Sequence, residues 1–232
     1  MENVYQTGKI ERKFYIQKKK DFARTFDIMK HMPSFAVYER GNETFTDYYY
    51  ETEDKFLEEM GVTVRRRVLK DKQIISVKYD DKILDKQDSM YQQPVHEQEV
   101  PLNEEFLNKE NLLFIEDKLN VIFGARLQID ILRKLNEMRV VYTVKTKRQT
   151  QEVVHNSGFK AFIYFDEVLY TNVAKEITYN DLILEVHMTS VGTQFNLTLL
   201  DFFVDELRKK MILVPMTDST YIAAKLFTRF KK

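Results

Sequence analysis

Charged side chains recur at every second position in a short run near the N-terminus. Lys9, Glu11 and Lys13 alternate with other residues in a segment that ends at Phe14. Successive side chains of a β-strand point to opposite faces of a sheet, so these three share one face. A charged strand face lies either in solvent or in a polar tunnel through a closed sheet. In such a tunnel, Lys and Arg hold anions and carboxylates hold divalent cations.

Further segments repeat this alternation along the chain. One of them places Arg65 and Arg67 on a common face, and another does the same for Glu97 and Glu99. Ionisable residues at this spacing occur in Val64–Val68, Ile74–Tyr79, His96–Val100, Val144–Arg148, Phe162–Asp166 and Leu184–Met188. Taken singly, each pattern is more typical of a solvated strand face than of a tunnel.

The remaining sequence predicts the elements that position these strands. Helical spacing of apolar residues or helix-capping residues predict helices at residues 18–32, 53–60, 103–123, 126–138, 196–211 and 219–227. Further β-rich runs cover residues 45–52, 139–154, 159–166 and 182–189, and the polar stretch 80–93 predicts a surface loop. Thr52 is expected to cap the helix that follows it, and Gly61 to end that helix.

Composition restricts the class of protein. The 232 residues suit one domain, residues 1–232, and 44% hydrophobic residues can furnish a core. The 36 basic and 36 acidic residues cancel, which does not favour a general nucleic-acid binder. The chain lacks cysteine, which excludes disulfides and thiolate metal sites. We see neither a signal peptide nor a membrane-spanning run, so a cytoplasmic protein with no membrane partner is expected.

Four of these segments, read in order, resemble the CYTH superfamily of triphosphate tunnel metalloenzymes. They are Ile10–Phe14, Tyr48–Thr52, Gly61–Arg67 and Ser76–Lys78. The similarity extends from about Ile10 to Phe227 and is more specific in the first half. It implies an α+β fold, with a closed antiparallel β-barrel of about eight strands flanked by helices. This order of segments favours a tunnel over a series of solvated strand faces.

The resemblance also implies roles for individual residues. Lys13, Arg65 and Arg67 would be catalytic. The substrate phosphates would be held by Lys9, Lys13, Arg65, Arg67 and Lys78, together with a basic residue from Lys145, Lys147 and Arg148. The inward register of that last group stays open, because a slip of one residue exchanges the two faces. Mg²⁺ or Mn²⁺ would be held by Glu11, Glu97, Glu99, Asp166 and Glu185.

Three positions depart from the family pattern. Lys9 and His187 stand where many members have a glutamate, and Val95 stands where many have an arginine. Fewer carboxylates leave the expected metal set incomplete. These changes are compatible with an altered substrate, altered metal use, or binding without turnover.

The resemblance implies a metal-dependent hydrolase of a triphosphate-bearing small molecule, such as tripolyphosphate, a nucleoside triphosphate or thiamine triphosphate. The alternatives are a class IV-type adenylyl cyclase and a non-catalytic module that binds nucleotide or polyphosphate. A nucleic acid would be a partner only through a 5′-triphosphate end, and a homodimer is expected from the family. Selectivity for the organic part of the substrate is expected in residues 80–93 and 103–123.

Overall fold

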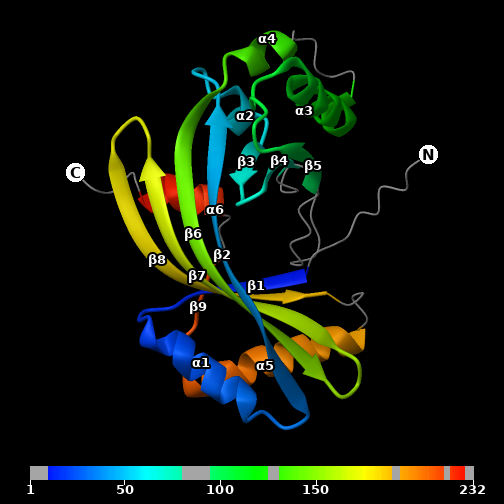
Figure 1. Cartoon of the computed structure of the whole chain (residues 1–232), viewed down its shortest axis with the longest axis vertical. Helices are drawn as coiled ribbons and strands as arrows, with labels where there is room; N and C mark the ends of the chain where they lie inside the picture. The colour runs from blue at the N-terminus through cyan, green and yellow to red at the C-terminus, as the bar shows by residue number, and fades with distance from the viewer. Residues whose placement is uncertain (1–9, 80–94, 125–130, 190–193, 217–219, 228–232) are drawn as a thin grey trace.

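The computed structural model describes residues 10–79, 95–124, 131–189, 194–216 and 220–227. These residues form an α+β fold (Figure 1). The strands are β1 (Ile10–Tyr15), β2 (Phe35–Glu51), β3 (Val62–Val68), β4 (Lys72–Tyr79), β5 (Val95–Pro101), β6 (Arg139–His155), β7 (Lys160–Asn172), β8 (Ile177–Met188) and β9 (Val214–Pro215). The helices are α1 (Lys20–Lys30), α2 (Phe56–Glu59), α3 (Lys109–Phe123), α4 (Ile131–Asn136), α5 (Gln194–Lys210) and α6 (Thr220–Phe227).

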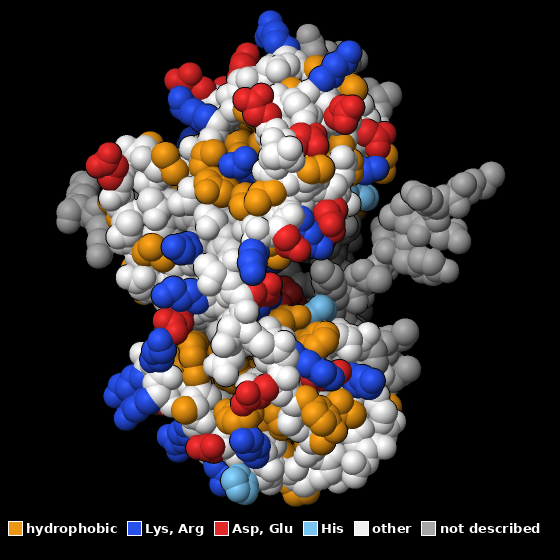
Figure 2. Space-filling model, viewed as in Figure 1, with side chains coloured by type: hydrophobic (Ala, Val, Ile, Leu, Met, Phe, Trp, Pro, Cys, Tyr) orange, Lys and Arg blue, Asp and Glu red, His pale blue; other side chains and the backbone are white. Residues whose placement is uncertain are grey.

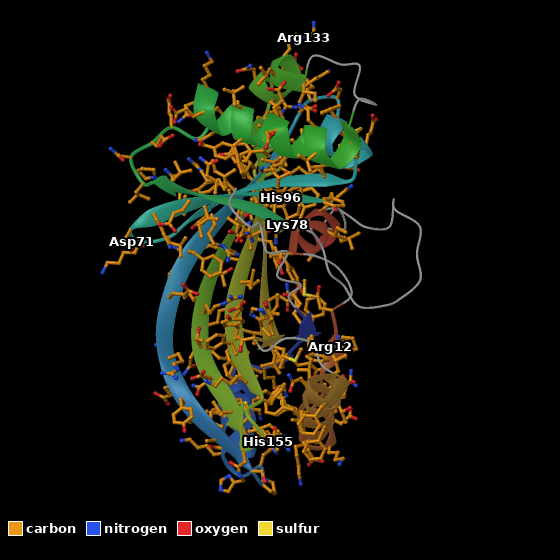
Figure 3. The ribbon with its side chains drawn as sticks, turned by 90° about the vertical axis from the view of Figure 1, so that its right-hand side faces the viewer. Arg12, Asp71, Lys78, His96, Arg133 and His155 are labelled. Carbon is orange, nitrogen blue, oxygen red and sulfur yellow. The ribbon has the colours of Figure 1, made fainter. Side chains whose placement is uncertain are left out.

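All nine strands belong to one antiparallel sheet, in the order β5-β4-β3-β2-β6-β7-β8-β1-β9. The sheet is strongly curved (Figures 1 and 3). Within the described residues, its edge strands β5 and β9 do not pair with each other. Closure of the barrel by hydrogen bonds, which the resemblance implied, is therefore not found there. The short β9 ends in Pro215, which has no N–H to donate to a further strand.

The long strands β2 and β6 form the spine of the sheet. Each has 17 residues, and they pair over almost their whole length. The pairing register shifts between Glu39 and Gly41 and again between Tyr49 and Tyr50. The prediction that β2 begins at residue 45 is wrong, since it begins at Phe35. Its residues 39–44 are exposed, so the sequence shows no alternation of buried and exposed positions there.

Helices cover the outer face of the sheet at both ends of the molecule (Figure 1). Phe22 of α1 and Phe203 of α5 belong to a core that includes Phe14, Ile163 and Leu184 of the sheet. At the other end, a second core joins residues of α2, α3 and α4 to β3 and β4: Leu57, Ile115, Leu119, Leu135, Val64 and Val77. Within these two cores the outward-facing strand positions are thus apolar.

Helix α6 packs on the inner face. Ala223 and Ala224 are fully buried against a third cluster that includes Tyr49, Val144 and Tyr170. Small side chains allow the helix to approach the sheet closely. The sequence prediction of a terminal helix at 219–227 is confirmed by α6, and that of a helix at 18–32 by α1.

The helix predicted at 53–60 begins later, at Phe56, with Lys55 as its N-cap residue, but the expected role of Thr52 at its start is found. The Thr52 hydroxyl accepts a hydrogen bond from the backbone N–H of Phe56 at 2.8 Å. The buried carboxylate of Glu51 accepts the next two N–H groups, of Leu57 at 3.0 Å and Glu58 at 2.8 Å. Gly61 follows with a φ of 65°, a conformation that favours glycine. The sharp turn between β2 and β3 is therefore built from local hydrogen bonds.

The predicted loop 80–93 lies outside the described residues. Of the helices that the structure describes, none is long and apolar enough to cross a membrane. Figure 2 shows acidic and basic side chains interspersed over the visible face of the coloured residues. This distribution agrees with the zero net charge of the sequence.

Candidate functional site

A cavity of about 440 Å³ lies within the curve of the sheet. Each of the strands β1 to β8 contributes at least one side chain to it, because alternate residues of every strand point inward. Among the described residues, the basic lining side chains are Lys13, Arg65, Arg67, Lys78 and Arg148. The acidic ones are Glu11, Asp47, Glu97, Asp166 and Glu185. The cavity therefore concentrates both signs of charge on a mostly buried surface.

Strands β1, β8, β7 and β6 form one charged wall. The Lys13 ammonium lies 2.9 Å from a carboxylate oxygen of Glu11 and 3.7 Å from one of Glu185. Arg148 binds Asp166 in a bidentate manner, at 2.8 and 2.6 Å, and lies 3.4 Å from Glu185. These groups form one continuous network of alternating charges.

Strands β2, β3, β4 and β5 form a second charged wall. Arg67 donates two hydrogen bonds to Asp47, at 2.7 and 2.8 Å. Arg65 lies 3.7 Å from Asp47 and donates to Ser76 at 2.8 Å and Glu97 at 3.2 Å. Its Nε is buried and has no hydrogen-bond partner among the described residues.

Lys78 of β4 differs from the other basic residues of the cavity. No carboxylate of the described residues lies within ion-pair distance of its ammonium, whereas the other four basic residues each have one. Burial lowers the pKa of Lys78 to about 7, and the nearby charges of Arg65, Lys13 and Arg67 act in the same direction. Figure 3 labels Lys78 among the strands in the upper half of the molecule. A bound anion would therefore stabilise the charged form of Lys78 more than that of the other four basic residues.

Three of the ion-paired groups have pKa values that are shifted in favour of their charged forms, unlike that of Lys78. Burial opposes the charged form of Glu185, but Lys13 and Arg148 outweigh it and lower its pKa to about 2. Burial likewise disfavours charge on Lys13, yet Glu185 and Glu11 raise its pKa. Asp47 has a lowered pKa because Arg65 and Arg67 overcome its burial. Asp166 is an exception, because its burial outweighs the effect of Arg148 and raises its pKa. Glu185, Lys13 and Asp47 therefore stay ionised over a wider range of pH than Asp166 does.

Most of the residues singled out in the sequence meet in this cavity. They are Glu11, Lys13, Arg65, Arg67, Lys78, Glu97, Arg148, Asp166 and Glu185. The open register in β6 is resolved in favour of Arg148. Lys145 and Lys147 line a separate depression with Glu167 and Asp181, since odd-numbered residues of this part of β6 point away from the cavity. Packing of Val144 in the third core cluster determines that orientation.

Two further predicted residues are not placed in the cavity. Glu99 is not among its lining residues; 63% of its side chain is exposed, and it pairs with Lys72 at 2.7 Å. Glu99 lies near the end of β5, beyond Glu97, so it shares a strand face with Glu97 but not the enclosed space. Lys9 lies outside the described residues.

The sequence reasoning missed Asp47, the central acid of the second wall. The sequence contained a pattern that could have identified it, because Asp47 alternates with Phe45 and Tyr49 on β2, and all three residues line the cavity. Tyr164, Thr63, Thr146, Thr220 and Tyr221 are further lining residues that were given no site role from the sequence. His187, noted only as a departure from the family pattern, also lines the cavity.

Glu11 and Glu185 converge on one cation, the Lys13 ammonium. In the described segments, no three acidic or histidine side chains gather closely enough to hold a metal ion by themselves. Mg²⁺ is commonly bound by one or two carboxylates together with substrate phosphates and water. A pair of convergent carboxylates beside an anion-binding surface therefore fits such an ion.

Comparison with known proteins agrees with this geometry. A sequence model of the CYTH domain matches residues 9–201. No curated protein matches the sequence significantly. Among solved structures, a candidate adenylate cyclase from Bacillus halodurans is 16% identical, with a TM-score of 0.51 over 97% of this chain and 100% of that chain. A candidate adenylyl cyclase from Hippeastrum with a dominant triphosphatase activity is 11% identical, with a TM-score of 0.58 over 94% of this chain and 96% of that chain.

The domain match covers most of the chain, and both structural likenesses extend over nearly its whole length. At these low identities, the structural likenesses establish the fold alone. The resemblance inferred from Ile10–Phe14 and the three segments after it is thereby confirmed. The chain belongs to the CYTH domain family.

Proposed function

We propose that the protein binds a triphosphate-bearing small molecule in the cavity and hydrolyses it with the help of a divalent metal ion. The observation that carries the proposal is the convergence of Lys13, Arg65, Arg67, Lys78 and Arg148 on one enclosed space. A triphosphate has several negative charges close together, so it requires cations from several directions. Arginine matches phosphate oxygens with a planar fork, and lysine acts as a point charge.

The ion pairs of the cavity show which contacts a bound phosphate must share or replace. Asp47 and Asp166 each engage an arginine, so a phosphate shares or replaces a carboxylate partner at these positions. Lys78 has no such partner among the described residues, and it gains a charge-assisted hydrogen bond without breaking one. Lys78 is therefore the first contact that we expect a triphosphate to make.

Glu11 and Glu185 are the side chains that would hold the metal ion, in place of the Lys13 ammonium. Bound there, Mg²⁺ or Mn²⁺ would neutralise phosphoryl oxygens during the reaction. Lys13 would then turn toward the phosphates. Hydrolysis forms a bond from a water oxygen to the terminal phosphorus and breaks the bond to the bridging oxygen. The leaving diphosphate group keeps the electron pair, and the proton lost by the water passes to the solvent.

Phosphate release with Mg²⁺ or Mn²⁺ tests this function. The panel consists of tripolyphosphate, ATP, GTP and thiamine triphosphate, and the variants are Lys13→Ala and Glu185→Gln. Lys145→Ala is the matched control, because Lys145 lies on the opposite side of the sheet. We expect metal-dependent release that falls at least tenfold in the first two variants and is unchanged in the control. No metal-dependent release from any of the four compounds would refute the hydrolase.

A non-catalytic triphosphate binder is the second candidate. It is favoured by the ion pairs themselves, since the five acidic groups of the cavity already have cationic partners. Such a protein would be stabilised against heat by tripolyphosphate without releasing phosphate. Cyclic AMP formation from ATP, measured on the same samples, identifies the adenylyl cyclase alternative.

A further inference from the structure

Three neighbouring rings form a row on the cavity face of the sheet. Phe162 and Tyr164 alternate on β7, and His187 of β8 lies opposite Phe162 in the register. The ring centroids of Phe162 and Tyr164 are 6.1 Å apart with planes inclined by 26°. Those of Tyr164 and His187 are 6.2 Å apart, inclined by 34°. We refer to these three side chains as the ring ledge.

The ring ledge is continuous with the cationic groups. Tyr164 and His187 line the charged cavity, and the guanidinium carbon of Arg148 lies 3.9 Å from the centroid of Tyr164. Phe162 is not a lining residue, although it is on the same face of β7. The ledge therefore begins beside Arg148 and extends beyond the cavity by one ring. A group attached to bound phosphates would meet it on leaving the cavity.

Phe162 has no part in the described hydrophobic cores. Its neighbours Ala161 and Ile163 are fully buried beneath α1 and α5, on the opposite face of the sheet. Phe162 itself is only partly buried and belongs to none of the three core clusters. Single exposed apolar residues are common, but this one extends a row of rings at the edge of a charged site. Such a row offers apolar surface to a planar ligand.

We infer that the ring ledge binds a planar aromatic group of the substrate, so that the protein prefers aromatic triphosphate esters over triphosphates without a ring. This inference rests on the proposed triphosphate site. Stacking on aromatic side chains tolerates different rings, because every base has a π-face. The ledge therefore selects for the presence of a ring and not for its hydrogen-bonding groups.

This assignment differs from the sequence expectation, which placed selectivity in residues 80–93 and 103–123. Helix α3 packs with Ile115 and Leu119 in the outer core, together with Val77 of β4. Lys78, the next residue, points into the cavity on the other side of the sheet. The described part of that segment is thus separated from the cavity by a strand layer. Residues 80–93 lie outside the described structure.

Dissociation constants measured by calorimetry in EDTA, where turnover is prevented, test the inference. The ligands are ATP, thiamine triphosphate and methyl triphosphate, which is also an ester but has no ring. We expect at least one aromatic ester to bind about tenfold more tightly than methyl triphosphate, a typical effect of stacking one ring. Phe162→Ala should remove this advantage and leave methyl triphosphate binding within about twofold of native. Phe162→Tyr should retain it.

Phe202→Ala is the matched control, because Phe202 is a 47% exposed phenylalanine on α5, away from the cavity. It should leave all three constants unchanged. If Phe162→Ala weakens all three ligands equally, or none of them, the ring ledge is refuted while the triphosphate site stands. If native protein binds methyl triphosphate as tightly as both aromatic esters, the ledge is refuted as well. Failure of all three to bind overturns the triphosphate site and the ledge together.

Discussion

Replacing Arg148 with methionine is expected to destabilise the fold strongly. The guanidinium holds Asp166 through two hydrogen bonds of 2.8 and 2.6 Å and lies 3.4 Å from Glu185. The side chains of Arg148 and Asp166 are only 13% and 7% exposed, so solvent screens the pair poorly. Methionine keeps most of the apolar stem and removes only the charge. Asp166 is then a buried carboxylate without its partner.

Removal of one member of a buried ion pair typically costs about 3–5 kcal/mol. For a domain of this size, that loss corresponds to a fall in Tm of roughly 6–20 °C. The free energy of unfolding would be measured by urea denaturation, with equal m-values as the check that only stability has changed. Lys147→Met is the control, because Lys147 directly precedes Arg148 in β6 but is exposed on the opposite face. It should stay within about 0.5 kcal/mol of native.

A second variant shows whether the orphaned charge causes the loss. Arg148→Met combined with Asp166→Leu should recover part of the stability, because the unpaired carboxylate is gone and Glu185 still has Lys13 at 3.7 Å. A loss of less than about 1 kcal/mol in Arg148→Met would refute the reasoning, since removing one member of a buried bidentate pair leaves the other charge uncompensated. An equal loss in Lys147→Met would contradict the assigned register of β6.

Three other outcomes are expected. Lys78→Met should stabilise the protein at pH 7. Native Lys78 binds its proton more weakly in the folded state than in the unfolded state, so native stability rises between about pH 7 and the ordinary lysine pKa of 10.5, and the variant should lack this rise. Urea unfolding measured across this pH range would show the difference. Thr52→Ala should cost about 1 kcal/mol in urea unfolding through loss of the α2 cap, and unchanged stability would argue against the Phe56 hydrogen bond. Chelation of divalent ions should abolish phosphate release. Tripolyphosphate should still raise the Tm, because the basic groups that bind it are side chains of the protein. A Tm shift that requires metal would contradict this expectation.

Much of the site could be predicted from period-two alternation. Successive residues of a strand face opposite sides, so Glu11 goes with Lys13 and Arg65 with Arg67 whatever the rest of the fold does. Asp47 escaped notice because it lies in a tyrosine-rich segment whose aromatic residues indicate packing. Its role as the shared partner of Arg65 and Arg67 depends on the pairing of β2 with β3, which places Asp47 opposite Arg67.

The inward-facing residues within 144–148 could not be predicted from the sequence alone. Lys145, Lys147 and Arg148 place basic groups on both faces of β6, so alternation alone cannot tell which face is inward. Only burial of Val144 against Tyr49 and Tyr170, under α6, turns Thr146 and Arg148 toward the cavity. Glu99 shows the same limit along the strand, because a shared face does not ensure a shared enclosure.

The sequence by itself determined the local periodicities, the caps of the turns and the order of charged strands that identifies the CYTH family. These properties depend on neighbouring residues, whose geometry the backbone restricts to a few conformations. Only the tertiary structure decided which charges pair across strands, that Lys78 is left without a carboxylate among the described residues, and that the described sheet stays open between β5 and β9. Those outcomes depend on contacts between segments far apart in the chain, which are set by the packing of the helices and the register of the sheet.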